Sequence, residues 1–174
     1  MALRWLIYGA YGYSGKLIAH QAKKRGYQPI LAGRNENALE PVARHLDFQY
    51  KVFSLDSIDE VQKQLEDVDL VVNCAGPFSQ TAIPLIQACI DTKTHYLDIT
   101  GEIDVFEYAH SMHKTAREAG IVLCPGVGFD VIPTDCIAAR LNAQMPEATH
   151  LALGFDSGSR MSRGTARTSI ERLG

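Results

Sequence analysis

The sequence lacks both a long hydrophobic run and an excess of charge of one sign. Among its 174 residues, 17 Lys and Arg stand against 20 Asp and Glu, which gives a formal net charge of -3. Such a balance provides no bulk attraction to nucleic acid or to an anionic membrane. No apolar run approaches the roughly 18 to 20 residues of a membrane span, and the first segment reaches Gly9 too early for a secretory signal. We therefore expect a cytoplasmic protein that binds no nucleic acid and has no membrane span.

Cysteine is scarce and scattered. The four cysteines are Cys74, Cys89, Cys124 and Cys136, and none lies within the roughly two to four residues of another that a thiolate metal site requires. The six histidines are also dispersed, without an HExxH motif. We therefore expect no metal site. Cys74 and Cys124 fall inside apolar runs, which favours a small buried thiol at both positions.

What the sequence does contain is a regular alternation of short apolar runs and segments with helical spacing, in a chain that is 46% apolar. Strands are predicted over residues 3–8, 28–32, 49–53, 70–74, 94–99 and 121–124, and helices over 14–25, 37–45, 58–66, 80–91 and 103–119. Strands that alternate with helices predict a parallel sheet with right-handed crossovers. The fold class is therefore α/β, a doubly wound parallel sheet of the Rossmann type.

Beyond Pro125 the alternation stops. A short helix is predicted over 134–141, a strand over 148–155, a tail rich in Ser, Gly and Arg over 157–168, and the start of a helix over 168–173. We assign residues 1–135 to one cofactor-binding domain and 136–174 to a linking helix, a strand and the truncated start of a second, α+β domain. A strand without a sheet of its own is expected to dock on a neighbouring protomer, to add to the first sheet or to be poorly ordered.

A glycine-rich turn joins the first predicted strand to the first predicted helix. Its residues are Gly9, Ala10, Tyr11, Gly12, Tyr13, Ser14 and Gly15. Glycines at this spacing permit a tight turn, a close approach of the backbone to a pyrophosphate and close packing of helix on strand. The free amides at the helix N-terminus then face the phosphates. Glycine turns also occur for steric reasons alone, but the strand–turn–helix context favours a dinucleotide site.

The end of the second strand distinguishes the two common dinucleotides. A carboxylate there binds the ribose hydroxyls of NAD, whereas an arginine accommodates the 2′-phosphate of NADP. This chain has Arg34 and Asn35 at that place and Glu36 one residue later. The arginine favours NADP, although a solvated Arg34 is the alternative and Glu36 keeps NAD possible.

Other strand ends add candidates, because ligands of open α/β sheets bind at the carboxyl ends of the strands. Asp56 follows the third strand, where it either contacts the adenine or caps the helix that begins at residue 58. Asn73, Ala75, Gly76 and Pro77 follow the fourth strand, and the small residues among them let the chain pass close to a cofactor.

Five ordered blocks of this sequence resemble saccharopine dehydrogenase-like oxidoreductases, in particular the branch that includes the trans-acting enoyl reductases. The blocks read YGAYGYSG (8–15), AGR (32–34), NCAGPF (73–78), YLDITGE (96–102) and GVGFDVIPTD (126–135), with a looser match at SRGTA (162–166). The resemblance implies an NAD(P)-binding Rossmann domain, followed in full-length members by a domain that supplies much of the substrate pocket. It places residues 9–15 at the phosphates, Arg34 at the 2′-phosphate and residues 75–77 beside the nicotinamide ribose.

Catalytic residues do not follow from the resemblance. Asp98 and Glu102 lie at the end of the fifth strand, where a nicotinamide ring is expected, and either carboxylate is a candidate for proton transfer or for anchoring a substrate amine. The alternative is that Asp98 or Thr100 caps the helix predicted from residue 103, with Glu102 stabilised by the positive end of that helix.

The leading hypothesis is thus an NADP-dependent oxidoreductase, or its cofactor-binding domain, that acts on a small molecule and forms a homo-oligomer. The main alternative is a non-catalytic dinucleotide-binding module with a regulatory or sensor role. An isomerase that uses bound NAD is a third possibility.

Overall fold

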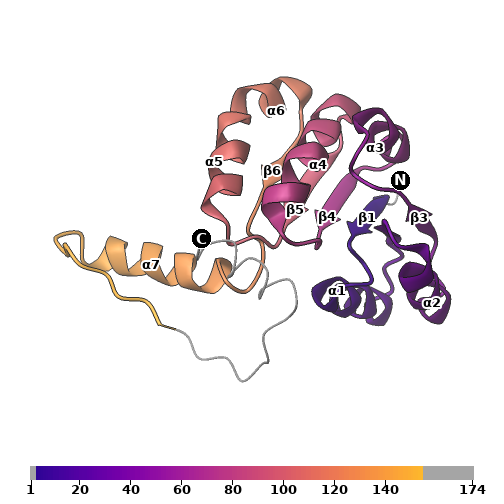
Figure 1. Ribbon diagram of the computed structural model, residues 1–174. Coiled ribbons are helices and arrows are strands. Elements are labelled where there is room, and N and C mark those ends of the chain that lie inside the picture. Colours follow the sequence, from indigo (N-terminus) through magenta and orange to yellow (C-terminus); the bar gives the residue numbers. More distant parts are fainter. Residues whose placement is uncertain (1–2, 155–174) are drawn as a thin grey trace.

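The computed structural model describes residues 3–154 of the chain, which contain six strands and seven helices (Figure 1). Up to β5 strands and helices alternate as the sequence predicts. The strands are β1 (Trp5–Tyr8), β2 (Ile30–Gly33), β3 (Tyr50–Val52), β4 (Leu70–Asn73), β5 (His95–Asp98) and β6 (Leu123–Cys124). The helices are α1 (Tyr13–Lys24), α2 (Glu36–Leu46), α3 (Ile58–Leu65), α4 (Phe78–Thr92), α5 (Ile103–Ser111), α6 (His113–Ala119) and α7 (Ile132–Gln144). In the described residues no helix is long and apolar enough to cross a membrane.

The strands form one six-stranded parallel sheet in the order β3-β2-β1-β4-β5-β6. Strand order reverses between β1 and β4, because the chain builds outward from β1 to β3 and then returns to the other side of β1. At this switch point Tyr8, the last residue of β1, pairs with Ala32 on β2 and with Asn73 on β4. Ligands of such sheets usually bind at the carboxyl ends of the strands beside this switch point, a region that we call the crevice.

Two separate hydrophobic cores cover the two faces of the sheet. Alternate residues of β1 serve different cores: Leu6 and Tyr8 pack with α3, α4, α5 and α6, whereas Ile7 packs with α1 and α2. Figure 1 shows these two groups of helices on opposite faces of the sheet. Because β1 is covered on both faces, its residues from Leu6 to Tyr8 are all buried. This burial holds the segment that follows, the glycine turn, in a fixed place.

The predicted helix over 103–119 is divided into α5 and α6. Met112 separates them with φ -85° and ψ 3°, and it is the C-cap of α5 and the N-cap of α6. Ala109 of α5 and Ala116 of α6 both lie in the core, at a spacing of seven residues that a continuous helix would also place on one face. A single departure from helical geometry leaves the apolar spacing almost unchanged, so the sequence pattern predicts one continuous helix.

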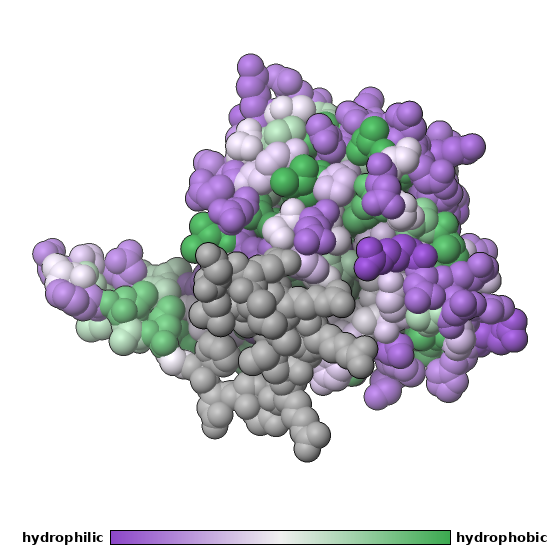
Figure 2. Space-filling model, viewed as in Figure 1, coloured by the Kyte–Doolittle hydropathy of each residue, from purple (hydrophilic) through white to green (hydrophobic). Residues whose placement is uncertain are grey.

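The segment after β6 departs most from the prediction. Helix α7 is longer than the predicted 134–141, has no buried residue and projects from the sheet domain (Figure 1). Apolar side chains are visible along it in Figure 2. The strand predicted over 148–155 is wrong for residues 148–154, which are irregular and pair with no other strand in the described chain. A strand needs a hydrogen-bonding neighbour, and none is placed beside it there.

The predicted tail over 157–168 and the predicted helix over 168–173 lie outside the described residues. The domain boundary at residue 135 stays a prediction. The prediction of a buried thiol is wrong for Cys124, which is exposed because β6 is a two-residue edge strand. Cys74 is half-buried, and burial raises the pKa of its thiol to about 12.

Candidate dinucleotide site

The glycine turn follows β1 directly and opens α1. Gly9 has φ +78°, a conformation that favours glycine, and the amides of Gly9 and Ala10 both donate to the Ala32 carbonyl, at 2.9 and 3.1 Å. The Gly12 amide donates to the Gly9 carbonyl at 2.9 Å. Gly12 is the N-cap of α1 and has no side chain to accept from the amides of the first helical turn. The positive end of α1 is thus available to an anion at the switch point.

The three glycines of the turn are sites of close backbone packing. A β-carbon at Gly9 would lie 2.8 Å from the β-carbon of Ala75 and 2.9 Å from its backbone nitrogen. A β-carbon at Gly15 would overlap the Gly9 carbonyl oxygen, and one at Gly12 would lie 3.1 Å from that same oxygen. Gly9 also brings the glycine turn into contact with the loop after β4, so the two sides of the crevice meet.

Aromatic and charged side chains gather at the far end of the turn, around β2 and β3. The Tyr8 hydroxyl donates to the Phe53 carbonyl at 3.2 Å. The pKa of Tyr8 is raised to about 12, mainly by burial, with Tyr11 and Asp56 also raising it and Arg34 lowering it. These three groups therefore lie within electrostatic reach of Tyr8. Arg34 itself is exposed at the end of β2. The structure therefore brings together the residues predicted to hold the adenosine end.

At this end of the crevice, Asn35 caps a helix and Asp56 does not. Asn35 is the N-cap of α2, where its side-chain oxygen accepts from the Ala38 amide at 3.2 Å. The alternative interpretation of Asp56 as the cap of α3 is wrong, because Ser57 takes that position and accepts from the Glu60 amide at 3.4 Å. Cofactor contacts of Asn35 and Asp56 stay predictions.

The loop after β4 is held by a buried amide. Asn73 is fully buried; its Oδ1 accepts from the Ala75 amide at 3.0 Å, and its Nδ2 donates to Thr81 Oγ1 at 3.1 Å and to the Tyr96 hydroxyl at 3.2 Å. Thr81 Oγ1 in turn donates to the Ala75 carbonyl at 2.6 Å. The loop also contains a cis peptide bond between Gly76 and Pro77. Asn73 thus shapes the loop from within, and its contact with a cofactor stays a prediction.

Asp98 ends β5 and is fully buried. Its Oδ1 accepts from the amides of Thr100 and Gly126, at 3.0 and 2.8 Å, and its Oδ2 accepts from the Tyr96 hydroxyl at 2.8 Å. Burial raises the pKa of Asp98, the hydrogen bonds lower it in part, and Glu102 raises it. Asp98 therefore joins the loop after β5 to the loop after β6 rather than capping α5.

Glu102 precedes α5 in the sequence, but its carboxylate lies at the N-terminus of α4. Its carboxylate oxygens accept from the amides of Phe78 and Ser79, at 3.0 and 2.7 Å. Thr100 Oγ1 accepts from the Glu102 amide at 3.0 Å. The negative charge is favourable there because it meets the positive end of α4. Asp98 and Glu102 are both buried and hydrogen-bonded. A proton-transfer role for either carboxylate stays a prediction.

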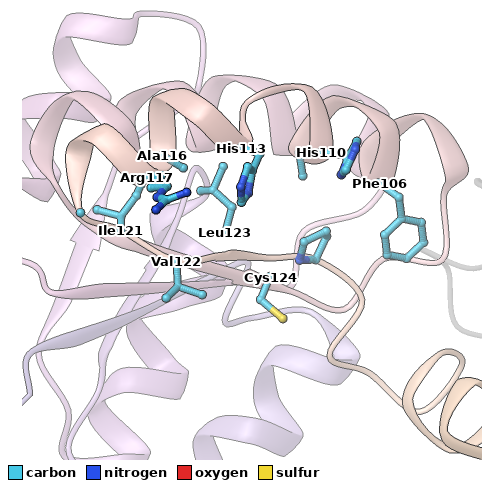
Figure 3. Close-up of a pocket in the computed structure, with 12 residues that line it drawn as sticks. Phe106, His110, His113, Ala116, Arg117, Ile121, Val122, Leu123 and Cys124 are labelled. Atoms are coloured by element: carbon cyan, nitrogen blue, oxygen red, sulfur yellow. The ribbon is translucent and has the colours of Figure 1, made fainter.

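A groove of about 680 Å³ lies away from the crevice, between β6 and the helices α5 and α6. His110, His113 and Arg117 lie along it (Figure 3). Among residues 3–154, no group of three or more His, Cys, Asp or Glu side chains is placed to hold a metal ion.

The sequence motifs indicate most of the residues in the crevice, but they do not predict that Tyr96 and Thr81 bind the Asn73 side chain. Both hydroxyls are buried or half-buried partners of Asn73. The sequence signals for Tyr96 are its place in the YLDITGE block and its position two residues before Asp98, so that both side chains lie on one face of β5.

The parallel sheet, the strand order and the glycine turn at the switch point define a dinucleotide-binding Rossmann domain. The chain belongs to the family described as the saccharopine dehydrogenase NADP binding domain, whose model matches residues 5–124. The resemblance inferred from the sequence motifs is thereby confirmed.

Similar proteins include the saccharopine dehydrogenase-like oxidoreductase of Mus musculus, 29% identical over an alignment of 153 residues that covers 75% of this chain and 35% of the relative. A trans-acting enoyl reductase of Mycobacterium leprae is 32% identical over an alignment of 150 residues that covers 82% of this chain and 36% of the relative. The chain thus spans about a third of the length of these relatives. A relative from Arabidopsis thaliana, 32% identical, is described as probably mitochondrial.

Among solved structures, the apo saccharopine dehydrogenase (L-Glu forming) of Saccharomyces cerevisiae superimposes with a TM-score of 0.70 at 16% identity, covering 84% of this chain and 32% of that one. This likeness confirms the predicted doubly wound α/β fold.

Proposed function

We propose that the chain binds NADP and forms the cofactor-binding part of an oxidoreductase that acts on a small molecule. The observation that carries this proposal is the uncapped N-terminus of α1 at the switch point, with Arg34 exposed at the end of β2. In the proposal, the amides of residues 13–15 face the pyrophosphate and Arg34 faces the 2′-phosphate. When bound, NADP supplies or accepts the hydride.

The loop of residues 74–77 is proposed to flank the nicotinamide ribose. Its support is the contact of Ala75 with Gly9, which places this loop beside the phosphate turn. Asp98 and Glu102 lie in the adjoining loops, where their hydrogen bonds favour a role in holding backbone segments together. Proton transfer by either carboxylate is tested by turnover of the amide variants in a full-length relative. Unchanged turnover would exclude it.

A non-catalytic dinucleotide-binding module is the second candidate. The observation that favours it is the burial of both candidate carboxylates, which leaves neither exposed to a substrate. NADPH oxidation by a longer protein across a substrate panel distinguishes the two candidates. We also propose that the protein forms a homo-oligomer and is located in the cytoplasm.

The cofactor assignment is tested by measuring the affinities for NADPH and NADH by calorimetry. We expect the wild-type chain to bind NADPH more tightly, and Arg34→Ala to weaken NADPH binding by about tenfold or more while NADH binding changes little. Arg44→Ala is the matched control, because Arg44 is an exposed arginine of the next helix, paired with Glu40. Equal losses for both dinucleotides in Arg34→Ala would refute the 2′-phosphate role, and a wild-type chain that binds neither would refute the proposed function.

A further inference from the structure

A continuous chain of buried polar side chains crosses the carboxyl edge of β4 and β5. It runs from Thr81 through Asn73 and Tyr96 to Asp98, with successive separations of 3.1, 3.2 and 2.8 Å. Asn73, Tyr96 and Asp98 have no exposed surface. The parallel register pairs Asn73 with Asp98, and Tyr96 lies on the same face of β5 as Asp98. All three side chains therefore meet on one face of two adjacent strands.

Both ends of this chain hold backbone segments of the crevice. At one end, Asn73 Oδ1 accepts from the Ala75 amide and Thr81 donates to the Ala75 carbonyl, so both polar groups of that residue are fixed. At the other end, Asp98 accepts from the Gly126 amide through its side chain and from the Val127 amide through its carbonyl, both at 2.8 Å. The loops after β4, β5 and β6 are thus linked through groups that are buried or half-buried.

The Tyr96 hydroxyl is the centre of the chain, because it accepts from Asn73 and donates to Asp98 at the same time. Removal of this oxygen atom would remove one of the two hydrogen bonds that Asn73 Nδ2 donates and the hydrogen bond that Asp98 Oδ2 accepts, which is costly at buried groups.

We propose that Tyr96 is a positioning residue for the nicotinamide half of the dinucleotide, acting through Asn73 and the loop of residues 74–77. This inference rests on the proposed function. Tyr96 is fully buried, so in this proposal it acts on the cofactor through the position of the Ala75 backbone. The residues proposed to hold the adenosine half, from β2 and β3, take no part in the chain of hydrogen bonds. Tyr96 therefore affects one half of the ligand more than the other.

The test compares two ligands and two hydroxyl deletions. NADPH contains both halves of the dinucleotide, whereas adenosine 2′,5′-bisphosphate contains only the adenosine half. We expect Tyr96→Phe to weaken NADPH binding about fivefold to tenfold and to change binding of the bisphosphate less than about twofold. Thr94→Val is the matched control: Thr94 is a buried residue that precedes the opposite end of β5, and its hydroxyl donates to the Val68 carbonyl at 2.9 Å. The control should leave the ratio of the two affinities at its wild-type value.

A purely structural role for Tyr96 predicts equal loss for both ligands, and that result, or an unchanged NADPH affinity, would overturn the inference. Should Tyr96→Phe fail to fold, Thr81→Val breaks the same chain at its other end and must show the same selective loss. A wild-type chain that binds the bisphosphate and NADPH equally well would also overturn the inference while leaving the adenosine site intact. Absence of binding to both ligands would instead reject the proposed function itself.

Discussion

The ring of Tyr11 lies against the backbone of Gly33, so closely that a β-carbon at Gly33 would be 2.5 Å from Tyr11 Cε1. This contact joins the glycine turn to the end of β2, immediately before Arg34. The position of the phosphate turn relative to Arg34 thus depends on the packing of the Tyr11 ring against Gly33, which has no side chain.

The first prediction concerns this contact. Gly33→Ala displaces the Tyr11 ring, and we expect it to weaken binding of adenosine 2′,5′-bisphosphate several-fold. In a Tyr11→Ala background the same substitution meets no ring and should have little further effect. A double-mutant cycle of bisphosphate affinities measures the coupling. Independent, additive losses would show that the ring does not mediate the effect.

Two glycines with nearly the same backbone conformation should differ in their tolerance of alanine. Gly9 and Gly26 have φ of +78° and +76°, but a β-carbon at Gly26 meets nothing within 4 Å, whereas one at Gly9 meets Ala75. Gly26→Ala should cost about 1 kcal/mol of the free energy of unfolding, for backbone strain alone. Gly9→Ala should cost roughly 3 kcal/mol or more, because overlap adds to strain. Urea denaturation of both variants measures the difference, and equal costs would contradict the close approach.

The stability of the fold should depend on pH through Asp98. Because burial raises its pKa above the ordinary value of 3.8, the folded chain binds this proton more tightly than the unfolded chain does. The resulting stabilisation is complete below the ordinary value and is lost as the pH rises through the raised one. Asp98→Asn has no such titration. We expect the free energy of unfolding of the wild type, minus that of the variant, to fall as the pH rises above about 4. A difference that instead grows with pH would show that folding lowers the pKa of Asp98.

Glu102 should contribute to stability through the N-terminus of α4. Glu102→Gln removes the charge that accepts from the Phe78 and Ser79 amides, and we expect a loss of about 1.5 to 3 kcal/mol in the free energy of unfolding. Glu107→Gln, an exposed position on α5, is the control and should change it by about 0.5 kcal/mol or less. Similar small effects in both variants would show that the cap is dispensable.

The sequence predicted the elements of the sheet domain well because the information lies in short segments. Apolar runs such as residues 70–73 and the glycine turn determine local structure almost independently of the rest of the chain. Alternation of strands and helices then restricts the topology to a doubly wound sheet. The break at Met112 could not be predicted in this way, because it depends on how α5 and α6 meet the core.

The contacts within the crevice were less predictable, because they join residues distant in sequence. Glu102 precedes α5 and was expected to act on that helix, yet it accepts from amides 24 and 23 residues earlier. Asp98 likewise reaches Gly126 across 28 residues. The sequence identified both carboxylates as unusual; only the packing of three loops against one another shows what they contact.

The pairing of β1 has a consequence for the order of folding. The glycine turn precedes β4 in the chain, but its conformation depends on Ala75, which packs on Gly9, and on β4, which pairs with β1. A nascent chain that ends before β4 can pair β1 only with β2. We therefore expect the phosphate turn to mature late, after a non-local closure that slows folding and leaves one edge of β1 transiently open to other chains.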